Sequence, residues 1–144
     1  TLRTLMHVVA LILWLSTQPA FAASIDTVGT CDSLTYEPDT VRLSGRLERH
    51  TYPGRPNYES IAKGDEAETG FYLRPDEPIC LSHGKTDIDD EPVTGVKLVQ
   101  LVLDARGYDR LRPRLGQRVT VRGTLFHSET GHHHATLLLW VIWH

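Results

Sequence analysis

The fold is decided by the stretch Val119-Thr120-Val121-Arg122-Gly123-Thr124-Leu125. Its apolar and polar side chains alternate, which is the pattern of a β-strand with one buried face and one wet face. The turn residues Ser128-Glu129-Thr130-Gly131 follow, and they lead into an apolar run from Ala135 to Trp143. We therefore predict that the C-terminal part of the chain forms a β-hairpin with a four-residue loop.

Working outward from this hairpin, three further strands are predicted at Val41–Glu48, Phe71–Leu73 and Val96–Leu103. The spacing of Tyr108, Leu111 and Leu115 predicts a short helix between the third and fourth strands. This order predicts an all-β domain with small α content, arranged as a five-stranded antiparallel OB-like barrel. An open β-sandwich is the alternative, but it needs more strands than the sequence offers.

The first 22 residues have the pattern of a secretory signal. Arg3 precedes an apolar run from Val8 to Leu15, and Ala20-Phe21-Ala22 fits a cleavage site. The apolar run is shorter than the roughly 20 residues that span a bilayer. We therefore expect a signal peptide at 1–22, an irregular lead-in at 23–40 and a barrel domain at 41–144. The expected location is periplasmic or secreted, without stable membrane insertion.

Composition restricts the class of ligand. The formal net charge of the 144 residues is -3, which argues against a dedicated nucleic-acid-binding protein. Arginines gather between positions 106 and 122, and they either contact an anionic partner or form a solvated surface that pairs with acidic residues.

Two cysteines, Cys31 and Cys80, are present. In an oxidising compartment an even count favours a disulfide. Two buried free thiols, or a metal site with two ligands, are the alternatives.

Three stretches carry a resemblance to known sequences. They are Pro56-Asn57-Tyr58-Glu59-Ser60-Ile61 with Lys63-Gly64-Asp65, then Pro78-Ile79-Cys80, then Gly123-Thr124-Leu125-Phe126 followed by Thr130-Gly131-His132-His133-His134. In these motifs the chain resembles an uncharacterised family of exported bacterial domains of unknown function. The resemblance covers roughly Tyr36 to Val141. It implies an exported OB-like domain and no particular reaction.

The long segment from Tyr52 to Glu68 is the first candidate site. Long loops in compact domains are often functional. Ring surface and polar groups suited to ligand binding are offered by Tyr52, Arg55, Asn57, Tyr58 and Asp65. The alternative interpretation is that Tyr58 and Ile61 only fold the loop onto the barrel.

Histidines supply the second candidate site. In the predicted hairpin His127 faces His132, and His134 lies two residues further along the same face. Three imidazoles on one face can bind Zn²⁺ or Cu²⁺. A pH-sensing role and a purely structural role are the alternatives, and a register slip of one residue would scatter the three side chains.

No catalytic motif supports an enzyme. The sequence has no G-x-S-x-G elbow, no phosphate-binding glycine loop and no H-E-x-x-H pair. We therefore expect a non-enzymatic binding domain without a required cofactor. Its expected partner is a protein or glycan of the cell envelope or the extracellular space, bound in an inhibitor, immunity or accessory role. A periplasmic metal-binding protein that uses the three histidines is the alternative function.

Overall fold

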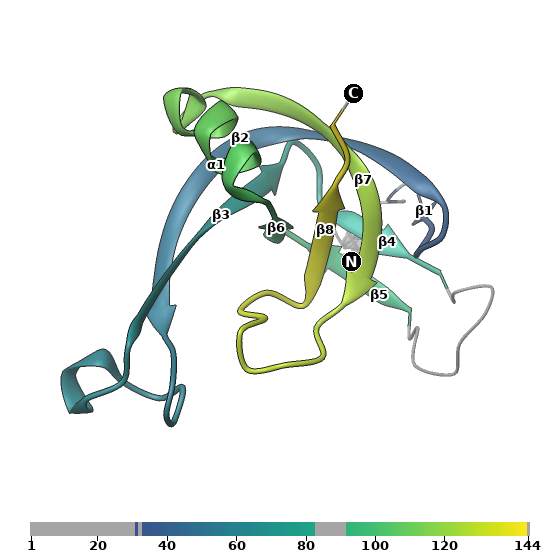
Figure 1. The fold of residues 1–144 in the computed structure, drawn as a ribbon. Coiled ribbons are helices and arrows are strands. Elements are labelled where there is room, and N and C mark those ends of the chain that lie inside the picture. The colour runs from purple at the N-terminus through teal and green to yellow at the C-terminus, as the bar shows by residue number, and fades with distance from the viewer. Residues whose placement is uncertain (1–30, 32, 83–91, 144) are drawn as a thin grey trace, which may run out of the picture.

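The computed structural model describes residues 31, 33–82 and 92–143 (Figure 1). The expected signal peptide lies outside the described residues, as do residues 23–30 and 32 of the expected lead-in. The strands are β1 (Ser33–Leu34), β2 (Thr40–Pro53), β3 (Ala67–Pro75), β4 (Ile79–Leu81), β5 (Val93–Val96), β6 (Val99–Val102), β7 (Arg118–His127) and β8 (Leu137–Val141). The helices are α1 (Ala105–Leu111) and two short 3₁₀ helices, Ile61–Lys63 and Arg112–Arg114.

Five strands close into a barrel in the order β2-β3-β6-β8-β7. The long strand β2 closes it, because residues 40–46 of β2 pair with β7 and residues 45–53 pair with β3. Four of the neighbouring pairs are antiparallel. The pair β6–β8 is parallel, so the expectation of an entirely antiparallel barrel is wrong at this place. The parallel pair arises because α1 and β7 separate the two strands in the chain and reverse the direction twice.

The alternating apolar residues that the sequence predicted for the strands fill the interior of the barrel. In β2 the inward side chains of Val41, Leu43 and Leu47 are buried, and in β7 those of Val119, Val121 and Leu125 are buried. Strand β8 contributes Leu137, Leu139 and Val141, and β6 contributes Val99 and Leu101. Burying apolar area at about 25 cal/mol per Å² drives this closure.

Helix α1 covers one end of the barrel, at the top of Figure 1. Asp104 directly precedes the helix, and its carboxylate accepts a hydrogen bond from the backbone N–H of Gly107 at 2.7 Å. This is an N-cap, which satisfies one of the free N–H groups of the first turn. Leu111 from the same helix is buried in the barrel core. The predicted helix therefore exists, but it begins earlier than the apolar spacing indicated.

A second, three-stranded sheet has the order β1-β4-β5. The predicted strand Val96–Leu103 is divided here, because β5 joins this small sheet while β6 joins the barrel. The expected lead-in is not wholly irregular, since β1 pairs in parallel with β4. A disulfide joins Cys31 to Cys80 beside this pairing, as predicted. It connects the start of the described chain to the middle of the sequence.

No helix among the described residues is long and apolar enough to cross a membrane.

Candidate functional site

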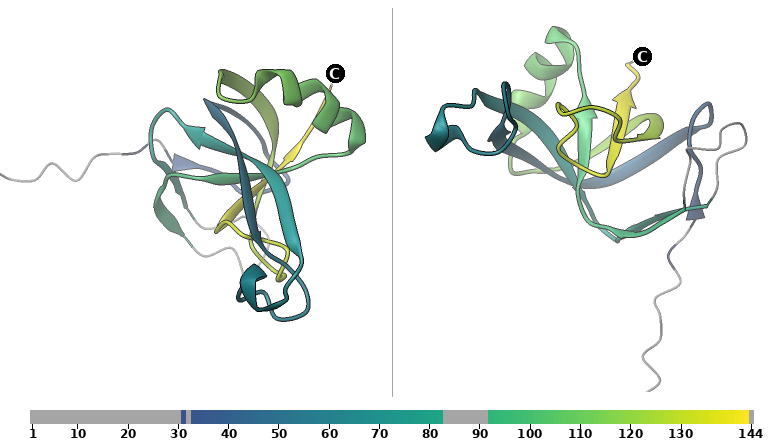
Figure 2. Two further views of the ribbon diagram at one scale, coloured as in Figure 1. Left: turned by 90° about the vertical axis from the view of Figure 1, so that its left-hand side faces the viewer. Right: turned by 90° about the horizontal axis from the view of Figure 1, so that it is seen from below.

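Two loops from distant parts of the chain meet below the barrel (Figure 2). One is the loop 54–66 that joins β2 to β3, and the other is the loop 128–136 that joins β7 to β8. The left view of Figure 2 shows the two side by side at the bottom of the molecule. The extended β2–β3 hairpin carries the first loop beyond the barrel wall, which brings it level with the second.

Asp65 organises the loop 54–66. Only 6% of this residue is exposed, although it is an acid. Its carboxylate accepts hydrogen bonds from the backbone N–H groups of Asn57, Glu59 and Ser60 at 3.0, 2.8 and 2.8 Å. The hydrogen bond from the Ser60 backbone is the main reason that the pKa of Asp65 lies below its ordinary value, and the bonds from Glu59 and Asn57 add to it. An ionised carboxylate surrounded by N–H donors is the centre of a folded loop.

The position of Asp65 changes the interpretation of two predicted ligand-binding residues. Both oxygens of Asp65 are used inside the loop, and the side-chain amide of Asn57 also donates to one of them at 3.1 Å. We therefore assign Asp65 and Asn57 to loop structure. Arg55 is exposed at the base of the loop, where its backbone oxygen accepts a hydrogen bond from the Glu66 N–H at 2.7 Å.

Tyr58 joins the first loop to the second. Its backbone has a φ of 59°, a left-handed value that is uncommon for a residue other than glycine. The phenol oxygen lies 3.2 Å from Nε2 of His132. Its ring packs on Gly131, where an added Cβ would stand 2.8 Å from the ring. Gly131 is therefore required for the close approach of the two loops.

Glu68 holds the second loop through two histidines. Its Oε1 lies 2.7 Å from Nδ1 of His132, and its Oε2 lies 2.9 Å from Nε2 of His134. Burial raises the pKa of Glu68, but the hydrogen bonds with His134 and His132 outweigh it and leave the pKa below the ordinary value of 4.5. The carboxylate is therefore ionised at neutral pH and can only accept, so each of these imidazole nitrogens donates a hydrogen bond to it.

This arrangement forms a hydrogen-bonded chain from carboxylate to imidazole to phenol. In the tautomer whose Nδ1–H donates to Glu68, Nε2 of His132 accepts a hydrogen bond from the Tyr58 hydroxyl. The His132 side chain is 50% exposed, whereas that of His134 is 11% exposed. The ring of His132 is therefore open to solvent, whereas that of His134 is largely covered.

Aromatic rings continue the site along the outer face of the barrel. Tyr52 stacks on His134 with ring centroids 4.9 Å apart, and it meets Tyr72 edge-on at 5.6 Å. Tyr72 also contacts His50 at 5.2 Å. Burial raises the pKa of Tyr72, so its hydroxyl stays protonated. These rings form one aromatic cluster, in which Tyr52 contacts His50, Tyr72 and His134.

Gln100, on β6, fixes the backbone of the loop 128–136. Its amide nitrogen donates to the backbone oxygen of His132 at 3.0 Å. Its amide oxygen accepts from the backbone N–H of His134 at 2.7 Å. One side chain from the barrel wall therefore sets the position of both imidazoles that contact Glu68.

The predicted histidine triad is wrong. His127 pairs with Leu137 instead of His132, because the loop between β7 and β8 has nine residues and not four. The His127 ring contacts the backbone oxygen of Ser128 at 3.2 Å and does not join His132 and His134. No group of three or more residues able to hold a metal ion occurs in the described part of the chain. The sequence pattern failed here because the four turn residues are not the whole loop.

The side chain of His133 lies inside the loop 128–136, which is longer than the predicted four residues. Its Nδ1 accepts hydrogen bonds from the backbone N–H groups of Glu129 and Thr130, at 2.8 and 3.3 Å. Burial is the main reason that the pKa of His133 lies below its ordinary value, which keeps this nitrogen free to accept. The ring also packs edge-on against Phe126. The loop folds around His133 and turns its two neighbours toward Glu68.

Comparison with known protein families finds one match. Residues 98–142 match the model of a domain of unknown function, DUF4431. The matched segment runs from β6 through α1 and β7 to β8. It contains Gln100, His132 and His134, whereas Tyr52, Tyr58 and Glu68 lie outside it. The match supports the expected similarity to an uncharacterised domain. Neither the curated proteins nor the solved structures give a match.

The Glu68 contacts predict a pH-dependent junction between the loops. The pKa of Glu68 in the folded protein lies below its ordinary value of 4.5. The ionised carboxylate therefore contributes its full stabilisation at pH values above 4.5. This stabilisation is lost as the pH falls through the lower, folded-state pKa. The variant Glu68→Gln is expected to lower the free energy of unfolding by about 2 kcal/mol at neutral pH, because it weakens two charge-assisted hydrogen bonds.

Thermal unfolding measured from neutral pH to pH 3 tests this expectation. The difference between the wild type and Glu68→Gln should shrink at the acid end. A matched control is Glu66→Gln, an exposed acid in the preceding loop. A difference between wild type and Glu68→Gln that does not change with pH would contradict the assignment.

Proposed function

We propose that this chain is an exported, non-enzymatic binding domain with an OB-like barrel. The strand order, the helix between the third and fourth barrel strands and the closure of the sheet support the OB-like assignment. The disulfide between Cys31 and Cys80 supports an oxidising compartment, either the periplasm or the extracellular space. The ligand is a macromolecule of the envelope or the extracellular space.

The observation that carries this proposal is the junction of the two loops around Glu68. The loop 54–66 joins the first and second barrel strands, and the loop 128–136 joins the fourth and fifth. OB barrels bind oligonucleotides and oligosaccharides between these two loops and across the adjoining strands. Here the space is bordered by Tyr52, Tyr58 and His132, which are fixed in advance by their partners.

The chemistry of this border favours a glycan. The partly exposed rings of Tyr52 and Tyr58 offer apolar contact area, and the carboxylate of Glu68 keeps lone pairs that accept hydrogen bonds from sugar hydroxyl groups. The net charge of -3 disfavours a nucleic acid, whose phosphates require basic side chains. A protein partner at the same surface is the other outcome of the experiment below.

The hydrogen-bonded chain fits binding better than catalysis. The phenol of Tyr58 is engaged with His132, and its ring lies against Gly131 on the opposite loop. These contacts join the loops and hold the border of the site in one geometry. Preorganisation of this kind lowers the entropic cost of binding.

An array of soluble oligosaccharides, followed by calorimetry with any glycan that binds, tests the proposal. We expect Tyr52→Ala to weaken binding by at least about tenfold, because aromatic residues carry a large share of contact energy. Tyr58→Phe keeps the ring, so it should weaken binding less. Trp140→Ala is the matched control, since this side chain is exposed on β8 and contacts none of the site residues named above.

Binding that is lost in Tyr52→Ala and retained in Trp140→Ala would support the proposal. If no glycan binds, but the domain specifically captures a protein and Tyr52→Ala abolishes this capture, the ligand at this surface is a protein and not a glycan. Ligand binding that Tyr52→Ala leaves unchanged would reject this surface as the site.

A further inference from the structure

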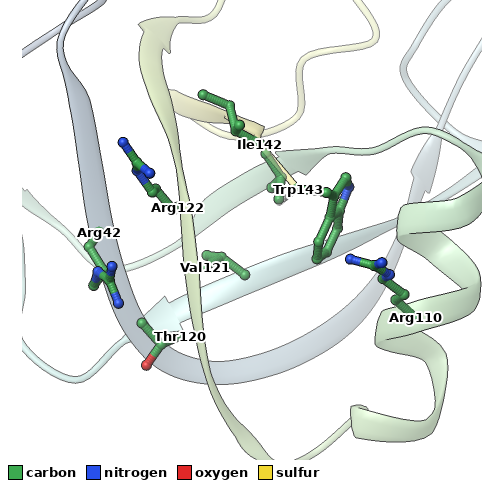
Figure 3. Close-up of a pocket in the computed structure, with 8 residues that line it drawn as sticks. Arg42, Arg110, Thr120, Val121, Arg122, Ile142 and Trp143 are labelled. Atoms are coloured by element: carbon green, nitrogen blue, oxygen red, sulfur yellow. The ribbon is translucent and has the colours of Figure 1, made fainter.

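A second concave feature lies away from the Glu68 site, near the C-terminal end of the described chain. It is a cavity of about 220 Å³, drawn in Figure 3. Its lining residues come from β2, α1, β7 and the end of the chain, and they are Arg42, Arg110, Thr120, Val121, Arg122, Val141, Ile142 and Trp143. Three of them are arginines and none is acidic. None belongs to the loops of the proposed glycan site.

The strand register places two of these arginines together. Arg42 on β2 lies directly opposite Arg122 on β7, so both side chains stand on the outer face of the sheet. The next outward pair along the ladder is Ser44 and Thr120, whose hydroxyls hydrogen-bond at 2.7 Å. The sheet thus places two arginines on neighbouring strands at one border of the cavity.

The third arginine approaches from the helix. The guanidinium carbon of Arg110 lies 5.2 Å from the centroid of the Trp143 ring, within the range of a cation–π contact. Figure 3 shows the Arg110 side chain extending from α1 toward this indole. Trp143 is itself held close to the helix, because a Cβ added at Gly107 would stand 3.1 Å from the indole. Arg110 is therefore positioned before any ligand arrives.

We propose that this cavity binds a tetrahedral oxyanion, the phosphate or sulfate group of a small molecule or of a lipid headgroup. Guanidinium groups recognise such anions through paired N–H donors, and Arg42 and Arg110 supply positive charge from two sides of the cavity. The volume is below the range of about 300–1,000 Å³ that is usual for drug-sized ligands. A cavity of this size can hold a compact anionic group, and the indole of Trp143 forms its apolar wall.

Calorimetry and Trp fluorescence with inorganic phosphate, and separately with sulfate, test the proposal at low ionic strength. Arg42→Gln and Arg110→Gln should each weaken binding by about tenfold, the usual scale of a charge-assisted contact. The matched controls are Arg49→Gln on β2 and Arg106→Gln on α1, which remove the same charge from the same elements outside the cavity. They should change the affinity by less than about twofold.

Sedimentation with phosphatidylcholine vesicles, with and without phosphatidic acid, separates a lipid headgroup from a free anion. Binding to either probe that is weakened by Arg42→Gln and Arg110→Gln but not by the controls would support the site. Equal weakening by all four variants, or no binding of phosphate, sulfate or phosphatidic acid, would overturn it. Circular dichroism of each variant shows whether it is folded. The glycan experiment is independent, since the two sites share no residue.

Discussion

Removal of the Cys31–Cys80 disulfide is expected to lower the free energy of unfolding by about 4 kcal/mol. The bond closes a loop with a sequence separation of 49 residues, and the chain-entropy model gives this magnitude for a loop of that length. It also secures β1 against β4, a pairing of only two residues. Without the bond, a two-residue strand has little to hold it in place.

Chemical denaturation of the wild type and of the double variant Cys31→Ser and Cys80→Ser measures this effect. Wild-type protein treated with a reductant should approach the stability of the variant. Alkylation mass shifts before and after reduction confirm the redox state in each sample. Equal stability of the oxidised and reduced wild-type protein would contradict the expected role of the bond.

Gly123→Ala is expected to destabilise the barrel by about 3 kcal/mol, the upper part of the range for overpacking a well-packed site. Gly123 on β7 lies between two strands, opposite Val41 on β2 and Val141 on β8. An added Cβ would collide with the backbone oxygen of Trp140 and stand 3.1 Å from the side chain of Leu139. The colliding atom is backbone, so it cannot rotate away.

Gly70→Ala on β3 is the matched control for this variant. The Cβ added there would stand 3.3 Å from the ring of Tyr72, which is a tight side-chain contact and not a collision with backbone. Thermal unfolding should therefore show a much larger decrease for Gly123→Ala than for Gly70→Ala. Similar melting temperatures for the two variants would contradict the close approach of β7 and β8.

The alternation of apolar residues predicted the barrel strands because burial and strand period are local properties. The inward positions of β2 and β7 were visible from Val41, Leu43, Val119 and Val121 alone. The disulfide was also predictable, since two cysteines offer one intramolecular connection. The division between β5 and β6 was not, because Val96 to Leu103 reads as one continuous apolar run.

The candidate site was predicted in part. Tyr52, Tyr58, His132 and His134 were among the predicted residues, but they were assigned to two separate sites. Glu68, which connects them, was missed because its role depends on a contact across more than 60 residues of chain. Strand register supplies the one usable signal: Glu68 lies opposite Tyr52 in the β2–β3 pair. Using that signal requires the length of the loop 54–66 between β2 and β3, and the turn residues in the sequence did not define this length.

The parallel pairing of β6 and β8 explains why the two loops meet. It places β8 between β6 and β7, so the loop 128–136 comes within hydrogen-bond distance of Gln100 on β6. The β2–β3 hairpin then reaches the same level from the neighbouring side of the barrel. A topology in which β8 lay at a sheet edge would not bring His132 to Glu68.

The central claim is that the two loops are joined through Tyr58, His132 and Glu68. Nuclear Overhauser spectra with assigned aromatic protons test it most directly. The account predicts cross-peaks between the rings of Tyr58 and His132, and between those of Tyr52 and His134, whose centroids lie 5.4 and 4.9 Å apart. Cross-peaks between the rings of His127 and His132, with none from His132 to Tyr58, would contradict it.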